Sequence, residues 1–330
     1  MDRLTSLSAE SRSDLFNETA LKLGMSPFIA EKDFWVCWTL KKIFQDDDLS
    51  SLLMFKGGTS LSKVFKLISR FSEDIDLILD WNVVSGDNNP LEARSKTQQA
   101  IFNRTMNDDA KGFIADHLLA QLNHLLQPIC DCQLDGDDGF VINVHYPAAF
   151  SDSYLRPVVR LEIGPLAAWL PFEQYAITPY SAEAFPDVFA APLCAVSAIV
   201  AERTFWEKAT ILHHEAHRPV DSIQPPRYSR HYYDLAMMAR TEVKNKALSD
   251  LPLLENVVAF KQQFYPRGWA QYDLAKVGTF RLLPEPYLIA VLQRDYAEMK
   301  QMIFGEYPSF DEIIETLSQL EAEINGEIIE

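Results

Sequence analysis

The chain is poor in cysteine and has no long apolar run, and both absences limit what kind of protein it is. Its 330 residues include only four cysteines, Cys37, Cys130, Cys132 and Cys194. The N-terminal segment MDRLTSLSAESRSDLF is polar and lacks the apolar core of a secretory signal. We therefore expect reduced thiols in a cytoplasmic protein. No stretch approaches the roughly 20 apolar residues that span a bilayer, so we expect no membrane contact.

Basic residues are also scarce. The chain has 30 lysines and arginines against 47 acidic residues, which gives a formal net charge of −17. This charge argues against a protein that coats nucleic acid without specificity, although it leaves room for a local basic patch beside a cleft. The acidic runs at 46–48, 135–138 and the C-terminus are typical of solvated surface.

Several familiar site motifs are missing. No G-x-x-x-x-G-K-[ST] sequence is present, which disfavours a P-loop ATPase. The histidines His213, His214 and His217 do not have H-E-x-x-H spacing, so a zinc hydrolase is the remotest enzyme hypothesis. The pair Cys130 and Cys132 is spaced too closely for a zinc knuckle and is better explained by strand packing. The loop 135–138 lacks the calcium-loop pattern.

The segment FKGGTSLSKVFKLISRFSEDIDLIL, residues 55–79, is the most informative part of the chain. A short apolar run ends at the pair Gly57-Gly58, and a helical pattern follows over 61–68. A glycine turn that leads into a helix presents bare backbone N–H groups to a phosphate. The alternative is a tight strand-to-helix turn with no ligand, because glycine is usual wherever φ is positive.

Polar residues next to the glycines strengthen the phosphate hypothesis. Thr59 or Ser60 caps the following helix, and Ser60 adds a hydroxyl donor. Lys63 lies about one turn further on and is expected to face the same phosphates. The predicted residues for binding a nucleoside triphosphate are Gly57, Gly58, Thr59, Ser60 and Lys63.

Two aspartates follow on a predicted strand, 74–79. Asp74 and Asp76 share one strand face, whereas Ile75 and Leu77 share the opposite face and are expected to pack on a core. Carboxylates so close together repel unless a cation lies between them. Mg²⁺ (or Mn²⁺) held by carboxylates and phosphate oxygens satisfies this requirement. A solvated edge strand is the alternative, and the upstream glycine pair weighs against it.

A third carboxylate is expected on the strand 156–163. Alternation places Arg160 and Glu162 on the same face. Glu162 is a candidate to bind a second metal or to accept the proton of an attacking hydroxyl. The equally weighted alternative is a plain ion pair between Arg160 and Glu162.

Lys208 is a candidate for the triphosphate itself. It lies in the helical pattern 201–217, where an ammonium offsets negative charge as a leaving group departs. The alternative is an exposed amphipathic helix face.

The order of patterns predicts an α/β (α+β) protein with two domains, 1–200 and 201–330, the second a helical domain that completes the active-site cleft. Helices are expected over most of 1–45, at 61–68, at 93–126 with a break near Asp108 and Gly112, and at 202–217, 228–240, 251–265, 286–304 and 310–324. Strands are expected at 52–55, 74–79, 129–134, 140–146, 156–163 and 175–180.

GGTSLSK followed by RFSEDIDL resembles the AbiEii/AbiGii toxin family, a branch of the polymerase-β-like nucleotidyltransferases that includes the MenT toxins. The resemblance continues in three other segments: Glu31-Lys32-Asp33 before aromatic residues, 202–208 with ERT and EK, and RHYYD at 230–234. Residues 241–330 match no motif that we can name. The family implies a mixed sheet with flanking helices.

The resemblance also implies roles for single residues. Gly57, Gly58 and Ser60 would hold the nucleotide phosphates, and Asp74 and Asp76 would coordinate metal. In the second half of the chain, Lys208 would contact the triphosphate and Asp234 would support the site. His231 stands where the family usually has an acid, so its role is open.

These expectations describe a metal-dependent nucleotidyltransferase, in which an acceptor hydroxyl attacks the α-phosphorus of a nucleoside triphosphate and pyrophosphate leaves. The family implies the toxin of a type IV toxin–antitoxin or phage abortive-infection system, with RNA, including tRNA 3′ ends, as acceptor and a cognate antitoxin as partner. One alternative is transfer to a protein or a small molecule, which the acidic composition keeps open. Another is a nucleotide-binding module without turnover, against which the intact acids and glycines weigh.

Overall fold

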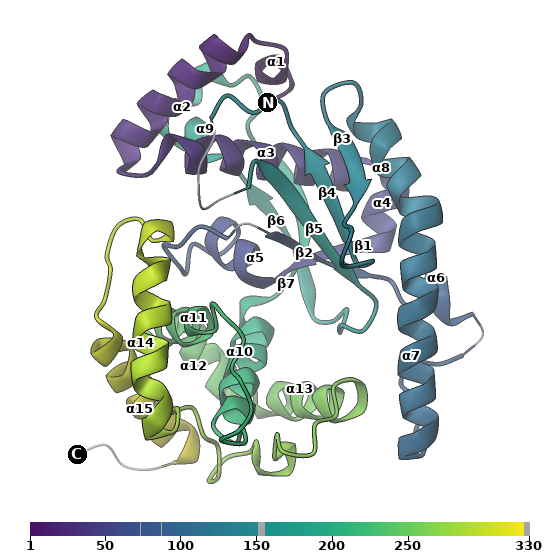
Figure 1. Ribbon diagram of the computed structural model, residues 1–330, viewed down its shortest axis with the longest axis vertical. Helices are drawn as coiled ribbons and strands as arrows, with labels where there is room; N and C mark the ends of the chain where they lie inside the picture. Colours follow the sequence, from purple (N-terminus) through teal and green to yellow (C-terminus); the bar gives the residue numbers. More distant parts are fainter. Residues whose placement is uncertain (73, 87, 151–155, 327–330) are drawn as a thin grey trace. The chain divides into compact units, whose positions relative to one another are not determined.

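The computed structural model describes residues 1–330 except 73, 87, 151–155 and 327–330. The chain forms two compact units (Figure 1). Unit 1 consists of Met1–Val64 and Phe71–Ile199, and unit 2 consists of Phe65–Arg70 and Val200–Glu330. The main division falls between Ile199 and Val200. The transfer of Phe65–Arg70 to unit 2 was not predicted.

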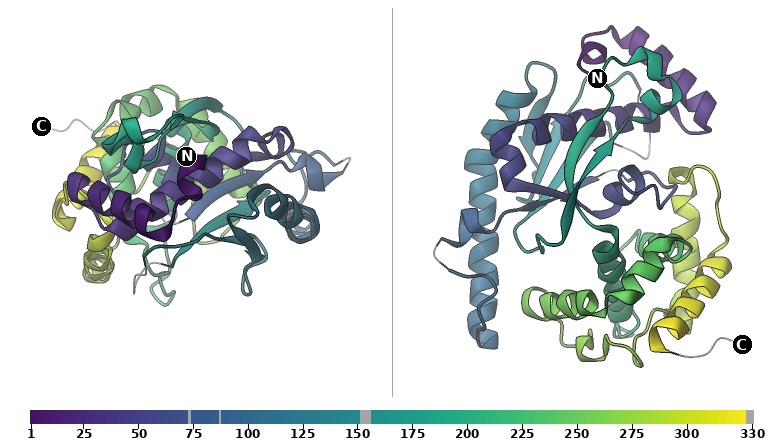
Figure 2. Two further views of the ribbon diagram at one scale, coloured as in Figure 1. Left: turned by 90° about the horizontal axis from the view of Figure 1, so that it is seen from above. Right: turned by 180° about the vertical axis from the view of Figure 1, so that it is seen from behind.

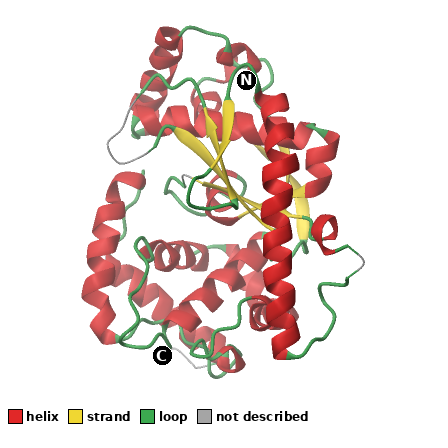
Figure 3. Ribbon diagram, turned by 45° about the vertical axis from the view of Figure 1, so that its right-hand side comes forward, coloured by secondary structure: helices red, strands yellow, loops and turns green. Residues whose placement is uncertain are grey.

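Within the described residues, every named strand belongs to unit 1 and joins one seven-stranded mixed sheet (Figure 3). Its strand order is β3-β4-β5-β2-β1-β7-β6. The central strand β2 pairs antiparallel with β1 and parallel with β5, and β1 pairs parallel with β7. The predicted α/β class and mixed sheet are thus confirmed. The strands are β1 (Leu53–Lys56), β2 (Asp74–Leu79), β3 (Asp131–Leu134), β4 (Val141–His145), β5 (Val158–Gly164), β6 (Phe172–Ile177) and β7 (Cys194–Ile199).

Helices surround this sheet in unit 1. The predicted helix 93–126 is interrupted by a π-helical turn, η1, close to the expected break. The helical elements are α1 (Asp2–Thr5), α2 (Ala9–Leu23), α3 (Pro27–Gln45), α4 (Asp47–Leu52), α5 (Gly57–Lys63), α6 (Asn82–Ser85), α7 (Lys96–Phe113), η1 (Ile114–Leu118), α8 (Leu119–Leu126), α9 (Tyr180–Ala184) and η2 (Pro186–Val188).

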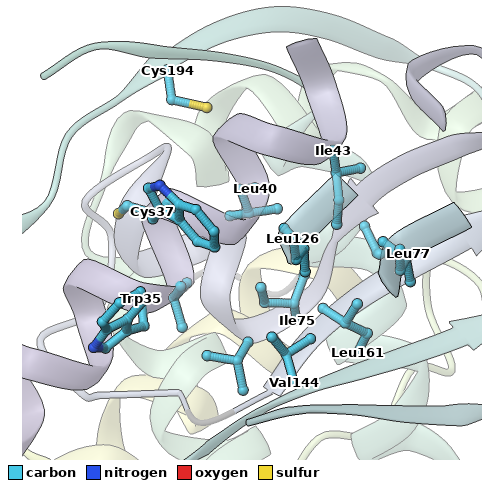
Figure 4. Packing of buried hydrophobic residues seen from close by; sticks show 14 of the residues in the cluster. Trp35, Cys37, Leu40, Ile43, Ile75, Leu77, Leu126, Val144, Leu161 and Cys194 are labelled. Atoms are coloured by element: carbon cyan, nitrogen blue, oxygen red, sulfur yellow. The ribbon is translucent and has the colours of Figure 1, made fainter. Parts of the chain in front are cut away.

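The main core lies between one face of the sheet and helices α3 and α8 (Figures 1 and 2). Ile75 and Leu77 of β2 point into it beside Leu40 of α3 and Leu126 of α8 (Figure 4). All of these side chains are buried, so β2 alternates as predicted and turns its even-numbered residues to the other face. On that second face, the described residues form a small apolar cluster around Ile78.

Helix α3 carries buried charges at Glu31-Lys32-Asp33, although charged residues are seldom fully buried without partners. The Glu31 carboxylate accepts hydrogen bonds from the backbone N–H groups of Ala149 and Phe150, at 2.8 and 3.1 Å. The Lys32 ammonium donates to the carbonyl oxygen of Arg156 at 3.0 Å. These bonds attach α3 to the segments that precede β5.

Asp33 attaches α3 to α5. Its Oδ1 forms an ion pair with Lys63 Nζ at 2.7 Å, and its Oδ2 accepts from the backbone N–H of Tyr180 at 2.6 Å. The Lys63 ammonium also lies 3.6 Å from the centroid of the Tyr180 ring. Burial alone would lower the pKa of Lys63, but the attraction of Asp33 outweighs burial and raises it. Lys63 is therefore a charged group that depends on Asp33.

Unit 2 is helical in its described residues. Helix α10 packs on α11, α12 and α13, and α11 packs on α15. The helical elements are α10 (Ala201–Glu215), α11 (Ser229–Ala239), α12 (Glu242–Ser249), α13 (Leu251–Phe264), η3 (Tyr272–Leu274), η4 (Pro286–Leu288), α14 (Ile289–Glu298), η5 (Met299–Met302) and α15 (Phe310–Asn325). None of the helices in the described residues has the length and apolar character needed to cross a membrane.

The segment Phe65–Arg70 is held in unit 2 by backbone and side-chain bonds. The carbonyl oxygen of Ser69 accepts from the N–H of Phe304 at 2.9 Å, and the N–H of Ser69 donates to the Tyr233 hydroxyl at 3.3 Å. Arg70 forms an isolated β-bridge with Ile303. Phe65–Arg70, a segment between α5 and β2, is consequently a part of unit 2.

Several elements differ from the sequence prediction. Strand β7 was missed, because a buried parallel strand lacks the alternation that marks a half-buried one. Strand β6 begins and ends earlier than the predicted 175–180. Helix α5 starts at Gly57 itself and ends at Lys63, so the expected helix 61–68 is displaced. The predicted helix 286–304 is divided into η4, α14 and η5, and α12 was not anticipated.

The Asp33–Lys63 pair predicts a large effect on stability. Asp33→Asn leaves a buried ammonium without its counter-ion, so the free energy of unfolding should fall by about 3–5 kcal/mol. Urea denaturation followed by tryptophan fluorescence measures this. The double variant Asp33→Leu with Lys63→Met should recover most of the loss, since apolar replacements of a buried pair are often neutral.

The matched control is Glu202→Gln. Glu202 pairs with the exposed Lys246 at 3.8 Å, and a surface pair of this kind contributes under about 1 kcal/mol. A loss for Asp33→Asn no larger than that of this control would contradict a stabilising role for the buried pair.

Candidate active site

The glycine turn and the second aspartate lie in direct contact. Lys56 at the end of β1 pairs with Asp76 of β2, and α5 begins at the next residue, Gly57. Gly57 has φ +82°, and a Cβ there would lie 2.6 Å from Cγ of Asp76 and closer still to Oδ2. The Asp76 carboxylate therefore rests against bare backbone that only glycine provides. The structure brings together the turn and the acid that the sequence predicted to act together.

The hydroxyl groups of the turn donate hydrogen bonds to nearby backbone carbonyl oxygens. Thr59 donates its hydroxyl hydrogen to the carbonyl oxygen of Asp74, and Ser60 donates to the carbonyl oxygen of Gly57 at 2.8 Å. Both side chains are buried. Thr59 thus links α5 to the first residue of β2. The bond that Ser60 makes supports the shape of the turn, whereas the sequence predicted that its hydroxyl would bind phosphate.

The placement expected for Lys63 needs correction. The sequence placed its ammonium beside phosphate, but the side chain is buried in the ion pair with Asp33 that is described above. The physical reason is that Asp33 of α3 offers the ammonium a buried counter-ion, with Oδ1 2.7 Å from Nζ. The contribution of Lys63 is to fix α5 against α3.

Asp74 and Glu162 lie with an arginine on the second face of the sheet. The parallel register of β2 and β5 aligns Asp74 with Arg160 and Asp76 with Glu162. Arg160 Nε is 3.4 Å from Asp74 Oδ1, and Arg160 Nη2 is 3.8 Å from Glu162 Oε1. The predicted pairing of Arg160 with Glu162 is therefore the weaker of two contacts, and the guanidinium lies closer to Asp74.

The donor set fits a cation that is shared with a substrate. In the described residues, no three His, Cys, Asp or Glu side chains are grouped so as to hold a metal ion. Asp74 and Asp76 are hard oxygen donors on one strand face, partly exposed. Mg²⁺ commonly binds to one or two carboxylates together with substrate phosphates, whereas an all-protein cage needs more ligands. The two aspartates fit the former arrangement.

Unit 2 contains a separate buried charge cluster around Asp234 of α11. Asp234 Oδ1 accepts from Arg70 Nε at 2.7 Å, and Oδ2 accepts from Arg70 Nη2 and from Lys208 Nζ, each at 2.8 Å. Burial opposes ionisation of Asp234, but Arg70 and Lys208 outweigh burial and lower the pKa of its carboxyl. Lys208, which is buried and not on an exposed helix face, is thus paired with the acid that the family resemblance singled out.

His231 contacts the same lysine. Its Nδ1 lies 3.2 Å from Lys208 Nζ. Burial, with Lys208 and Arg230 nearby, lowers the pKa of the ring well below its usual value. A neutral ring accepts the lysine hydrogen at Nδ1 when its own proton is on Nε2. His231 therefore orients Lys208 without adding the negative charge that an acid would bring.

Sequence reasoning missed Arg70 as the bidentate partner of Asp234. The available signal was its position at the start of the motif RFSEDIDL, of which residues 74–77 were assigned to the metal-binding strand. Nothing in a linear sequence indicates that this arginine belongs to unit 2, because that follows from the docking of Phe65–Arg70.

The histidines of α10 have partners other than metal. His213 Nε2 lies 3.1 Å from the carbonyl oxygen of Gln271, and its Nδ1 accepts from the N–H of Arg281 at 3.0 Å. His214 Nε2 lies 2.8 Å from the carboxylate of Glu215. His213 thus attaches the segment after α13 to α10, which gives this residue a structural explanation and leaves the zinc hypothesis without support.

Comparison with known families agrees with this geometry. Residues 38–316 match the model of the family described as nucleotidyl transferase AbiEii toxin of type IV TA systems. The match spans most of the chain. The chain belongs to the AbiEii nucleotidyl transferase toxin family. It is therefore a nucleotidyltransferase, and the resemblance inferred from the motifs is confirmed.

Two solved structures align with this chain over most of its length. MenT4, a nucleotidyltransferase toxin from Mycobacterium tuberculosis H37Rv, is 17% identical with a TM-score of 0.43, over 97% of this chain and 98% of its own. A nucleotidyltransferase from H. pylori is 14% identical with a TM-score of 0.42, over 90% of this chain and 95% of its own. No curated protein matches the chain. The assignment to the AbiEii family rests on the sequence match.

The contact between Gly57 and Asp76 predicts that Gly57→Ala is costly. Gly24 is the matched control, because it also has positive φ but no atom within 4 Å of an added Cβ. Gly24→Ala should lower the free energy of unfolding by about 1–2 kcal/mol through backbone strain alone. Gly57→Ala adds a collision with Asp76 and should cost clearly more in urea denaturation. Equal losses in the two variants would show that the carboxylate does not lie against the turn.

Burial of His213 predicts a stability that depends on pH. Desolvation lowers the pKa of its ring to about 4, although the hydrogen bond to Gln271 acts in the opposite direction, while a histidine in the unfolded chain keeps its ordinary pKa of 6.5. The unfolded chain therefore binds a proton that the folded chain does not. The resulting stability is present above pH 6.5 and is lost as the pH falls toward 4, at up to about 1.4 kcal/mol per pH unit.

Urea denaturation at a series of pH values tests this. His213→Gln should show a smaller fall in the free energy of unfolding between pH 7 and pH 5 than the wild type. His145→Gln, a change at an exposed histidine of β4, should keep the wild-type slope. An unchanged slope in His213→Gln would exclude His213 as the source.

Proposed function

We propose that this protein uses Mg²⁺ or Mn²⁺ to transfer a nucleotide from a nucleoside triphosphate to a hydroxyl group of RNA, as the toxin of a type IV toxin–antitoxin system. The observation that carries the proposal is the contact of the Asp76 carboxylate with the bare backbone of Gly57. It puts a candidate cation ligand next to the turn whose N–H groups are suited to phosphate. The same arrangement therefore offers a ligand to the metal and N–H groups to the phosphates of a metal-bound triphosphate.

The residues of unit 1 have separate roles in this proposal. Asp74 and Asp76 hold the cation, and the backbone of Gly57 and Gly58 faces the phosphates. The oxygen of the acceptor hydroxyl forms a bond to the α-phosphorus, the bond from that phosphorus to the β-phosphate oxygen breaks, and pyrophosphate leaves. A bound cation neutralises charge on the attacking and leaving oxygens. Glu162, at 44% side-chain exposure, is the proposed acceptor of the hydroxyl proton.

Lys208 and Asp234 are proposed to serve the same reaction, as the family resemblance implies. Lys208 would offset negative charge on the triphosphate. Asp234 holds the lysine in place, together with Arg70, through bonds of 2.7–2.8 Å. His231, three residues before Asp234 on the same face of α11, also supports the orientation of Lys208.

The proposed acceptor is RNA, including tRNA 3′ ends, and the proposed partner is a cognate antitoxin. Support comes from the family, whose description names a toxin of type IV TA systems. We propose a cytoplasmic location, where triphosphates and RNA are both available. The second candidate acceptor is a protein or a small molecule. The net charge of −17 favours it, because RNA binding requires positive charge on the protein surface.

A labelling experiment tests the reaction. Purified protein is mixed with each α-labelled nucleoside triphosphate and total RNA in Mg²⁺ or Mn²⁺, and the label is followed in the RNA and protein fractions. We expect label on RNA, abolished by EDTA. Asp74→Ala and Asp76→Ala should each reduce transfer by a factor on the order of 100 or more, because the charge that a cation neutralises is lost.

The matched control is Asp109→Ala, which removes an exposed acid from α7 and should leave transfer unchanged. Label that appears on protein and never on RNA would favour the second candidate. Transfer that persists undiminished in the Asp74→Ala, Asp76→Ala double variant would refute the proposed role of both aspartates.

A further inference from the structure

Arg160 touches three carboxylates from three parts of unit 1. Its Nη1 is 3.1 Å from Asp135 Oδ2 in the β3–β4 turn, its Nε is 3.4 Å from Asp74 Oδ1 on β2, and its Nη2 is 3.8 Å from Glu162 Oε1 on its own strand. Asp135 is the nearest of the three carboxylates to the guanidinium and Glu162 is the farthest. A single guanidinium thus lies among acids that would otherwise repel one another.

Several hydrogen bonds hold the Asp135 carboxylate in place for its contact with Arg160. Asp135 Oδ1 accepts from the backbone N–H groups of Asp137 and Asp138, at 3.1 and 3.3 Å. Its Oδ2 accepts from the side-chain amide of Asn143 at 2.9 Å as well as from Arg160. These bonds, the one from Asn143 first, lower the pKa of Asp135 to about 2. The turn therefore presents a fixed anion that locates Arg160.

Asp74 is held from the opposite direction. Its backbone carbonyl oxygen accepts from the Thr59 hydroxyl, while its carboxylate meets Arg160. The side chain of Asp74 is 28% exposed and that of Arg160 is 23% exposed, so neither is locked into a core. Because Asp135 fixes the guanidinium of Arg160, the guanidinium in turn orients the partly exposed carboxylate of Asp74.

We propose that Arg160 is a positioning residue that orients Asp74 and, by its charge, weakens the affinity of the two aspartates for a free divalent cation. The inference rests on the proposed function and deepens it. A permanent positive charge beside Asp74 lowers the affinity of the site for a metal ion that arrives without nucleotide. The cation then binds well only when triphosphate oxygens complete its coordination, which suits a metal that arrives with the nucleotide.

The proposal predicts opposite signs for two measurements. Replacement of Arg160 by a neutral residue removes a unit charge next to a cation ligand, so binding of metal alone should tighten, by roughly tenfold at a partly solvated site. The same change removes a contact that orients Asp74, so transfer should slow by roughly 10–100-fold, as for other residues that orient metal ligands. A purely structural arginine would weaken both.

The experiment measures Mn²⁺ binding to the full-length protein without nucleotide, by electron paramagnetic resonance of free Mn²⁺, and the transfer rate at saturating triphosphate. Arg160→Gln is the test variant. Arg160→Lys keeps the charge but loses the fork that reaches two carboxylates at once. It should bind Mn²⁺ within about threefold of the wild type and still transfer slowly. Near-ultraviolet circular dichroism checks that each variant is folded.

Arg294→Gln is the matched control. It removes the same charge from α14, where the side chain donates to the carbonyl oxygen of Ala290, and should change neither measurement. Tighter Mn²⁺ binding with slower transfer in Arg160→Gln supports the proposal. Mn²⁺ affinity in Arg160→Gln that is equal to or weaker than that of Arg294→Gln overturns it.

The two proposals fail in distinguishable ways. A wild-type protein that binds no Mn²⁺, with or without triphosphate, refutes the metal-dependent function and the role of Arg160 together. A wild type that binds Mn²⁺ and transfers nucleotide, with an Arg160→Gln variant unchanged in both, refutes only the role of Arg160.

Discussion

The site in unit 1 depends on the absence of a side chain at Gly57. Because its φ is +82°, the chain turns from β1 straight into α5, and the Asp76 carboxylate occupies the space that a Cβ would fill. Any larger residue would push apart the turn and the strand that carry the two parts of the predicted chemistry. The Thr59 bond to the backbone of Asp74 ties the same elements a second time. The geometry is thus specified by the close approach of backbone and side chain within unit 1.

Buried charge on α3 keeps this turn in place. The partners of Glu31, Lys32 and Asp33 lie on several different segments around the sheet, so a single helix fixes these segments at once. Such pairs add little net stability compared with apolar packing, but each is expensive to leave half-made. They therefore specify one arrangement of the segments and disfavour others. Lys63 belongs to this framework, which explains why a lysine so near the glycine turn is buried.

Both charge clusters use an arginine to restrain an acid. Arg160 meets Asp74 at a partly exposed strand face of unit 1, and Arg70 holds Asp234 in the interior of unit 2. The difference in burial separates their roles. Asp234 is fully buried, and its carboxylate is committed to two cations, so it organises Lys208. Asp74 keeps exposed surface, which is what a group that shares a cation with a substrate requires.

The sequence by itself determined the local features of this protein: the alternation of β2, the turn at Gly57, and the motif pattern that identified the family. These follow from short-range rules, because two-residue periodicity and positive φ are properties of neighbouring residues. Only the tertiary structure decided which distant groups meet. It paired Lys63 with Asp33, moved Phe65–Arg70 into unit 2, and put Arg160 between Asp74 and the β3–β4 turn. Such contacts join residues that are far apart in the chain, and nothing in a linear pattern records their distances.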